Sequence, residues 1–165
     1  MARRVFYSFH FKPDSWRASQ VRNAGVVEGN QPVSDNDWEA VKRGGDDAVK
    51  KWIADQLNGR TCTVVLIGAN TSTRKWVKHE IKESWNSGKG VAGIYVHRLK
   101  DANGAQSAKG DNPFDGFTFG EAKTPLSSVV KAYNPPGTSS TAVYQWIKDN
   151  LGAIVEEAIA TRKAH

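Results

Sequence analysis

Cysteine is nearly absent from this chain of 165 residues, since Cys62 is the only one. A single thiol forms no internal disulfide and builds no cysteine-rich metal centre, so both are excluded. Long apolar runs are also missing, because no stretch approaches the ~18 apolar residues of a membrane-spanning helix. The opening Met-Ala-Arg-Arg-Val lacks the apolar stretch of a secretory signal. We therefore expect a cytoplasmic protein with no membrane partner.

The sequence motifs of several common enzyme classes are missing as well. There is no Walker loop and no Gly-x-Ser-x-Gly nucleophile elbow. The string Gly-Lys-Gly-Val-Ala-Gly at 88–93 has dinucleotide-loop spacing, but it precedes a predicted strand instead of following one. His79-Glu80 begins like a zinc-protease motif, yet Glu83 stands where the second histidine is required. We therefore predict no metal site.

Positive charge and tryptophan are abundant by contrast. Lysine and arginine outnumber aspartate and glutamate by 23 to 17, giving a net charge of +6, and there are six tryptophans. A basic balance favours phosphate-bearing ligands or polyanions, although solvated lysines on helix faces explain most of this excess. The length suffices for one domain with its own core. We expect a single domain over residues 1–165, with a core at about 3–100, a loop or insertion at about 101–125, and a C-terminal strand and helix at about 126–162.

Apolar runs alternate with amphipathic segments along most of the chain. Strands are predicted at Arg3–Phe11, Val26–Val27, Thr61–Ile67, Val91–Val96 and Leu126–Tyr133. Helices are predicted at Trp16–Ala24 after a Pro13-Asp14-Ser15 start, at Trp38–Lys42, at Asp46–Leu57, from Ser72 or Thr73 to Gly88, and from a cap at Ser139 or Ser140 to about residue 160. This alternation predicts an α/β fold whose mostly parallel sheet carries helices on both faces.

Three polar segments are predicted to lack regular structure. Glu28–Asp37 has no hydrophobic period, and a loop of that length inside a domain is often functional, so it is a candidate gate. Asp101–Asp115 contains glycine, asparagine, serine and proline, which predicts an extended loop. Thr161–His165 is predicted to be frayed.

Glu80 is the exception on an otherwise ordinary amphipathic helix. Val77, Ile81 and Trp85 form its apolar stripe, and Glu80 stands at the border of that stripe, four residues after Trp76. A carboxylate at such a place is either satisfied in a structural hydrogen-bond network or kept for chemistry. In parallel sheets ligands bind beyond the carboxyl ends of the strands, where this helix starts.

The polar groups expected at that edge are one carboxylate, hydroxyls, aromatic rings and a histidine. Most glycosidases need two carboxylates, because one must protonate a poor leaving group. A pyridinium N-glycoside such as NAD needs no such acid, since nicotinamide leaves as a neutral molecule. One carboxylate then suffices to hold the ribose hydroxyls and to stabilise the positive charge at the anomeric carbon.

Five stretches share the pattern of one known family: Arg3–His10, Val21–Asn23, Cys62–Gly68, Lys75–Ile81 and Lys109–Asp115. Through them the chain, over about residues 3 to 115, resembles the TIR-like proteins of Thoeris antiphage systems. The resemblance implies a flavodoxin-like three-layer sandwich and cleavage of NAD by a glutamate in a Trp-x-x-x-Glu context, which Trp76 and Glu80 match. It also implies conversion of NAD to a cyclic ADP-ribose isomer or an ADP-ribose conjugate that activates a partner effector protein.

The resemblance assigns Glu80 as the catalytic residue, NAD as substrate rather than cofactor, and six substrate-binding residues: Ser8, Phe9, His10, Asn23, Trp38 and Trp76. Three of these have ordinary alternatives, because Phe9 can serve core packing, Asn23 can finish a helix, and Trp38 can cover the sheet. Related enzymes also imply that self-assembly or a phage-derived trigger is needed, so we expect the isolated protein to be slow or silent toward NAD.

Two other functional classes compete with this prediction. A non-catalytic TIR-like adaptor would bind other proteins and leave NAD untouched, with Glu80 in a structural role. A nucleic-acid-binding module would suit the net charge of +6, but the sequence lacks any recognisable reading element, so nucleic acid is not an expected partner.

Overall fold

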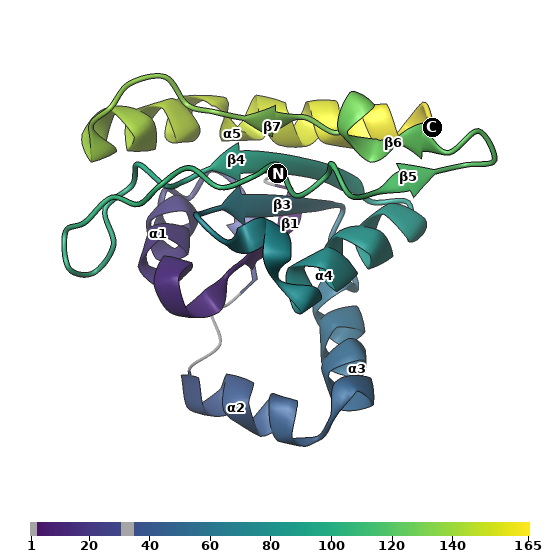
Figure 1. Cartoon of the computed structure of the whole chain (residues 1–165). Helices are drawn as coiled ribbons and strands as arrows, with labels where there is room; N and C mark the ends of the chain where they lie inside the picture. The colour runs from purple at the N-terminus through teal and green to yellow at the C-terminus, as the bar shows by residue number, and fades with distance from the viewer. Residues whose placement is uncertain (1–2, 31–34) are drawn as a thin grey trace.

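The computed structural model describes residues 3–30 and 35–165, and side chains for residues 3–30 and 39–165. Five strands form one parallel sheet in the order β2-β1-β3-β4-β7 (Figure 1). They are β1 (Arg4–Phe9), β2 (Glu28–Gly29), β3 (Cys62–Ile67), β4 (Gly90–Tyr95) and β7 (Ala132–Tyr133). This is the strand order of flavodoxin-like folds. The prediction that the strands near residues 4–9, 61–67 and 91–96 are parallel neighbours is confirmed.

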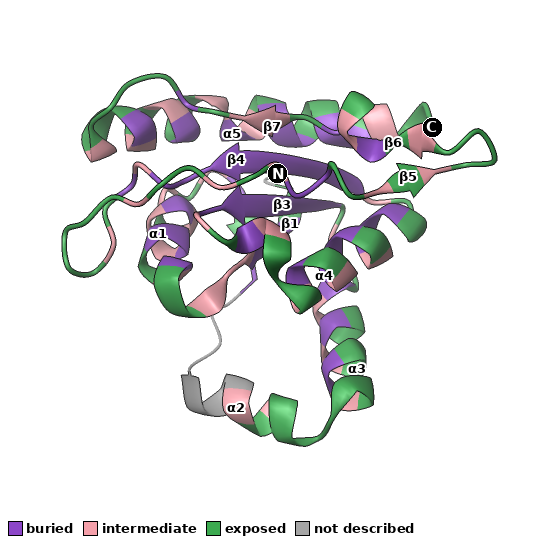
Figure 2. Ribbon diagram, viewed as in Figure 1, coloured by how far each residue is buried: buried purple, intermediate pink, exposed green. Residues whose placement is uncertain are grey.

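Helices cover both faces of the sheet, which confirms the three-layer flavodoxin-like architecture. The α-helices are α1 (Phe11–Asn23), α2 (Asp35–Arg43), α3 (Asp46–Leu57), α4 (Lys75–Asn86) and α5 (Ser140–Lys163), and the short 3₁₀ helices are η1 (Thr71–Thr73) and η2 (Leu126–Ser128). The apolar side chains of α1 and α5 pack on one face. Those of α3 and α4 pack on the other. Figure 2 shows the strands buried between helices whose outer sides are exposed.

The sequence of β3 reflects this double cover. All six of its residues are buried, so its run of β-branched and apolar residues is nearly continuous instead of alternating with polar ones. Val64 and Leu66 face α1 and α5, whereas Val65 and Ile67 face α4. Thr63 also stands on the α4 side, where its hydroxyl contacts Ser84. The strand therefore places polar groups beneath α4.

The first helix begins earlier than predicted. It starts at Phe11, directly after β1, whereas the sequence indicated Trp16. Pro13 lies in the first turn, where its missing N–H costs no helical hydrogen bond, so it does not delay the helix. Asp14 is no cap either, because its side chain is buried and paired with Arg17.

The second strand and the loop after it also differ from the prediction. The strand is Glu28–Gly29, not Val26–Val27, and it pairs with only two residues of β1. Asn30 ends the ladder, because its Oδ1 accepts the backbone N–H of Tyr7 at 2.8 Å. Within the predicted loop Glu28–Asp37, Glu28–Gly29 is a strand and Asp35–Asp37 begins α2, so the prediction is wrong at both ends, and residues 31–34 lie outside the described part of the chain.

Helix α4 has no side-chain cap at Ser72 or Thr73, because these residues belong to η1 and Arg74 precedes the helix. The predicted strand Leu126–Tyr133 is wrong over its first six residues, which begin with η2, and only β7 pairs, with Gly93 and Ile94. An unpredicted antiparallel hairpin lies within 101–125. Its strands, β5 (Thr118–Phe119) and β6 (Thr124–Pro125), have two residues each.

The C-terminal helix is longer than expected. Ser139 caps α5 as predicted, since its Oγ accepts from the N–H of Ala142 at 3.1 Å. The helix continues to Lys163 instead of fraying at Thr161, because Arg162 donates to the carbonyl of Trp85 at 2.9 Å and lies 4.6 Å from its ring. No helix among the described residues is long and apolar enough to cross a membrane.

Candidate active site

Glu80 lies beneath the carboxyl end of β1. Glu80 is only 8% exposed, although it belongs to a helix whose outer side is solvated. Ser8, the fifth residue of β1 and 1% exposed, donates a hydrogen bond from Oγ to Glu80 Oε1 at 2.7 Å. Ser8 pairs with Val65 of β3, so it points to the face that α4 covers. The sheet thus delivers a hydroxyl group directly to this carboxylate.

The electrostatic environment of Glu80 is unusual for a surface-helix carboxylate. Burial raises the pKa of Glu80 to about 8, and the hydrogen bond from Ser8 only partly opposes that rise. No cation pairs with this carboxylate in the described part of the chain. Oε2 accepts no hydrogen bond from the described residues and is not among the fully shielded side-chain atoms without a partner. Ser8 therefore holds one oxygen of the carboxylate, and Oε2 has no hydrogen-bond partner among the described residues.

The main chain of Glu80 is held by two further hydroxyl groups. Ser84, one turn later, donates from Oγ to the carbonyl oxygen of Glu80 at 2.6 Å. Thr63 of β3 contacts Ser84 Oγ through Oγ1, also at 2.6 Å. Both hydroxyl residues are completely buried. Neither residue was predicted from the sequence. Both could have been noticed, because Thr63 is a hydroxyl residue within a nearly continuous apolar strand and Ser84 is one beside the apolar stripe of α4.

Trp76 lies one turn before Glu80 on the same side of α4. Its ring is partly buried against the apolar cluster that α3 forms with Phe6. It meets the His79 ring edge-on at 5.7 Å, and Lys75 Nζ lies 4.8 Å from its centroid. The structure thus brings Trp76 to the Glu80 side of the helix, where it forms part of the boundary toward α3.

Phe9 and His10 lie at the same edge of the sheet but not against Glu80. The Phe9 side chain packs toward α1 and α5, on the opposite face from Ser8, and stacks on Phe11 at 6.2 Å. His10 follows the strand, and its Nδ1 is buried without a hydrogen-bond partner in the described part of the chain. Burial, with Arg74 nearby, lowers the pKa of His10, which favours the neutral imidazole.

The remaining two predicted substrate contacts do not join this group in the described structure. Asn23 is the last residue of α1, and it is exposed. Because α1 runs away from the carboxyl ends of the strands, Asn23 lies at the opposite edge of the sheet from Glu80. Trp38 belongs to α2, and its side chain lies outside the described residues.

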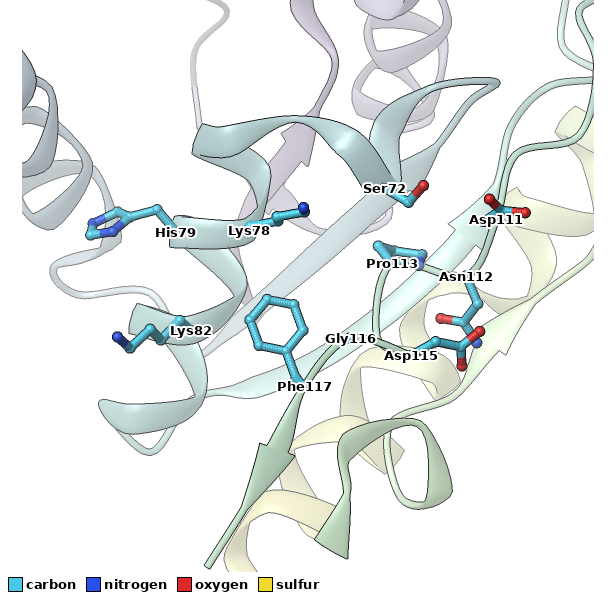
Figure 3. Close-up of a pocket in the computed structure, with 10 residues that line it drawn as sticks. All are labelled: Ser72, Lys78, His79, Lys82, Asp111, Asn112, Pro113, Asp115, Gly116 and Phe117. Atoms are coloured by element: carbon cyan, nitrogen blue, oxygen red, sulfur yellow. The ribbon is translucent and has the colours of Figure 1, made fainter. Parts of the chain in front are cut away.

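A cleft of about 530 Å³ opens on the other flank of α4, between that helix and segment 111–117. Figure 3 shows Lys78 extending from α4 toward Ser72, with Phe117 beside the helix. Lys78 and Lys82 each lie two residues from Glu80, so they project about 200° around the helix axis from it. Glu80 does not line this cleft, whose charged side chains are exposed.

The Lys109–Asp115 stretch, one of the motifs of the resemblance, has a structural role in the described chain. Phe114 is fully buried against the α4 side of the sheet. Gly110 crosses the end of β3 so closely that a Cβ there would lie 2.1 Å from the carbonyl oxygen of Gly68. Only glycine permits that approach. The motif thus closes the carboxyl edge of the sheet.

Metal ligands do not gather in the described part of the chain, where no group of three or more histidine, cysteine, aspartate or glutamate residues is placed to hold an ion. The α4 face of this edge offers the Glu80 carboxylate with its raised pKa and the Ser8 hydroxyl group, and a neutral imidazole and aromatic rings lie at the same edge. A second buried carboxylate, Asp14 on α1, is paired with Arg17, so Glu80 is the carboxylate that can stabilise a positive charge on a ligand.

Comparison with known proteins shows the family of this chain. The family model described as "Thoeris protein ThsB, TIR-like domain" matches residues 6–101, which include Ser8, Thr63 and Glu80. The Bacillus cereus (strain MSX-D12) protein ThsB1, provisionally named a cyclic ADP-D-ribose synthase, is 40% identical over 120 residues. That alignment covers 70% of this chain and 62% of the relative. The chain therefore belongs to the family of TIR-like domains of Thoeris ThsB proteins.

Proposed function

We propose that this chain cleaves the bond between nicotinamide and ribose in NAD, with Glu80 as the catalytic carboxylate. The observation that carries the proposal is the buried Glu80 side chain, held at Oε1 by Ser8 and without a cation partner in the described part of the chain. Membership of the ThsB family and the name of the Bacillus cereus relative support it. No cofactor is required, because NAD is the substrate.

The reaction begins when the bond between the anomeric carbon and the pyridinium nitrogen breaks. The electron pair goes to nitrogen, so nicotinamide leaves neutral and positive charge develops on the ribose. An ionised Glu80 stabilises that charge, and it does so strongly because burial lowers the local dielectric. The fixed positive charge of the bound pyridinium lowers the pKa of Glu80, so substrate binding itself promotes the ionised form.

The side chains around Glu80 have distinct roles in this proposal. Ser8 holds Oε1, which leaves Oε2 to accept a ribose hydroxyl. Trp76, beside Glu80 on α4, bounds the space on the α3 side, and His10 after β1 contacts the substrate as a neutral donor or acceptor. Phe9 contributes to substrate binding through its place at the sheet edge.

The fate of the ribosyl cation determines the product. Capture by another group of the same molecule gives a cyclic ADP-ribose isomer, and capture by a second small molecule gives a conjugate. The name of the Bacillus cereus relative favours cyclisation. We propose that the product acts in the cytoplasm as a signal that activates a partner effector protein, and that self-assembly or a phage-derived trigger switches the enzyme on.

Incubation of the protein with NAD, with and without lysate of phage-infected cells, tests this function. We expect nicotinamide and a product with the mass of ADP-ribose less one water, or of a conjugate, identified by mass spectrometry. Turnover by the dilute protein alone is expected to be slow, and lysate of infected cells should raise it. NAD that stays intact under every condition would support the adaptor function instead.

A further inference from the structure

The interface between α4 and the sheet is apolar except at two places, and both involve Glu80. Side-chain hydrogen bonds join α4 to the sheet, within the described part of the chain, only through Ser8 to the Glu80 carboxylate and through Thr63 to Ser84. Ser84 in turn binds the Glu80 carbonyl oxygen. The rest of this contact consists of apolar side chains. Both polar connections between α4 and the sheet therefore end on Glu80, one at its carboxylate and the other at its carbonyl oxygen.

Counting hydroxyl protons gives the second connection a direction. Ser84 has one hydroxyl proton, and it donates that proton to the carbonyl oxygen of Glu80 at 2.6 Å. The 2.6 Å contact between Thr63 Oγ1 and Ser84 Oγ must therefore be donated by Thr63. A chain of two hydrogen bonds thus runs from β3 through Ser84 to the main chain of Glu80. Such chains strengthen each bond in them.

The two connections come from adjacent strands. Ser8 of β1 pairs with Val65, and Thr63 of β3 pairs with Phe6, so the two hydroxyl residues are offset by one side-chain step on the same face. One connection holds the carboxylate of Glu80, and the other holds its backbone. We propose that the Thr63–Ser84 hydroxyl pair is a positioning device that fixes the rotation and height of α4, so that the Glu80 carboxylate meets Ser8. The inference rests on the proposed catalytic role of Glu80.

Mutation of the hydroxyl pair separates its effect on stability from its effect on the position of Glu80. Replacing both partners of a buried hydrogen bond by apolar groups of similar shape is close to neutral for stability, whereas removing one partner leaves the other unsatisfied. The double variant Thr63→Val with Ser84→Ala should therefore fold with nearly wild-type stability. Without the hydroxyl chain, α4 is free to rotate on its apolar contacts, and the bond from Ser8 to Glu80 lengthens. Thr63→Ser, which keeps the hydroxyl group, is the matched control.

The titration of Glu80 reports its position without any turnover. Burial raises the pKa of Glu80 and the hydrogen bond from Ser8 lowers it, and no charged group on α1, α3 or α4 adds to either effect within the described part of the chain. Because the bond from Ser8 lowers that pKa, a longer bond raises it further. We expect ¹³C carboxyl NMR to show the Glu80 midpoint at least about half a pH unit higher in the double variant than in wild type and in Thr63→Ser.

Steady-state kinetics provide the second readout. The double variant is expected to lose about tenfold in kcat with KM changed less than about threefold, because the fault lies in the placement of a reacting group. Its acid limb in kcat/KM should move to higher pH, whereas Thr63→Ser should keep the wild-type limb. A wild-type Glu80 titration in the double variant overturns the positioning role, whatever happens to NAD. If wild type cleaves no NAD, the proposed function fails, and the carboxyl titration still decides the positioning role.

Discussion

Two buried carboxylates lie near the carboxyl end of β1, and the protein treats them in opposite ways. Asp14, on α1, is 1% exposed and forms a 2.7 Å ion pair with the buried Arg17. Glu80, on α4 at the other face of the sheet, has a hydroxyl group as its hydrogen-bond partner. Arg17 also binds the carbonyl oxygens of Leu99 and Ala105, so the Asp14 pair ties α1 to the chain after β4.

The difference indicates what each carboxylate is for. An arginine beside Asp14 compensates its charge within the protein, although Arg17 holds only Oδ1 and Oδ2 is buried without a hydrogen-bond partner among the described residues. Burial raises the pKa of both groups, but at Asp14 the Arg17 guanidinium opposes that rise, whereas at Glu80 the opposing group is neutral. Glu80 therefore gains most from a positively charged ligand, which is the property that NAD cleavage requires.

The largest expected effect concerns the stability of the compensated pair. Asp14→Asn leaves Arg17 buried without its counter-ion, so the free energy of unfolding should fall by about 3–5 kcal/mol, measured by denaturant titration. NAD turnover per folded molecule should change less than about threefold. A variant that stays stable but loses turnover would remove the distinction between the two carboxylates.

An effect of comparable size is expected in the pH dependence of stability. The folded-state pKa of Glu80 is raised from 4.5 to about 8, so the folded protein binds the proton more tightly than the unfolded chain. This contribution is fully present below the unfolded pKa and is lost as pH rises through the folded pKa. Relative to Glu80→Gln, wild type should lose about 1.4 kcal/mol for each pH unit between about pH 4.5 and 8, which is on the order of 5 kcal/mol over that range. Parallel pH–stability curves of the two proteins would contradict the raised pKa.

Ser8→Ala tests the hydroxyl group that Glu80 has in place of a cation. Removing the donor should lower kcat/KM about tenfold at neutral pH and move its acid limb to higher pH, because the lost bond raises the pKa of Glu80. The measurement is a pH–rate profile for Ser8→Ala beside that of wild type. An unchanged acid limb would show that Ser8 contacts substrate only and does not hold Glu80.

The smallest effect is expected at Glu83, the next carboxylate on α4. It is only partly buried, and it makes no ion pair in the described part of the chain. Glu83→Gln should change turnover less than about twofold and stability by under about 0.5 kcal/mol. A large loss of turnover in this variant would mean that the helix, and not the position of Glu80, governs activity.

The sequence predicted the frame of the fold because hydrophobic period is a local property. Burial on both faces produces the nearly continuous apolar runs of β1, β3 and β4. Burial on one face produces the helical stripe of Val77 and Ile81 on α4. Element starts were less predictable, because Pro13 is equally compatible with a helix start or a first turn. The edge strand β2 was misplaced because only its pairing with Arg4 and Val5 defines it.

The candidate site shows the same limit. Glu80 was identifiable because a carboxylate beside an apolar stripe is visible in the sequence. The contacts that hold it were not, since the meeting of Thr63 with Ser84 depends on how α4 lies across β3. Asn23 was grouped with the site by resemblance, but the direction of α1 carries it to the other edge of the sheet. A motif gives residue types, and the orientation of an element decides which of them meet.

The most direct test of the catalytic assignment compares NAD turnover by wild type and Glu80→Gln, with folding checked by melting temperature. Glutamine keeps the size of the side chain but removes the negative charge. The account predicts a fall of two or more orders of magnitude, about 2.7 kcal/mol or more of transition-state stabilisation, in a protein that remains folded. A folded Glu80→Gln protein that cleaves NAD at the wild-type rate would contradict it.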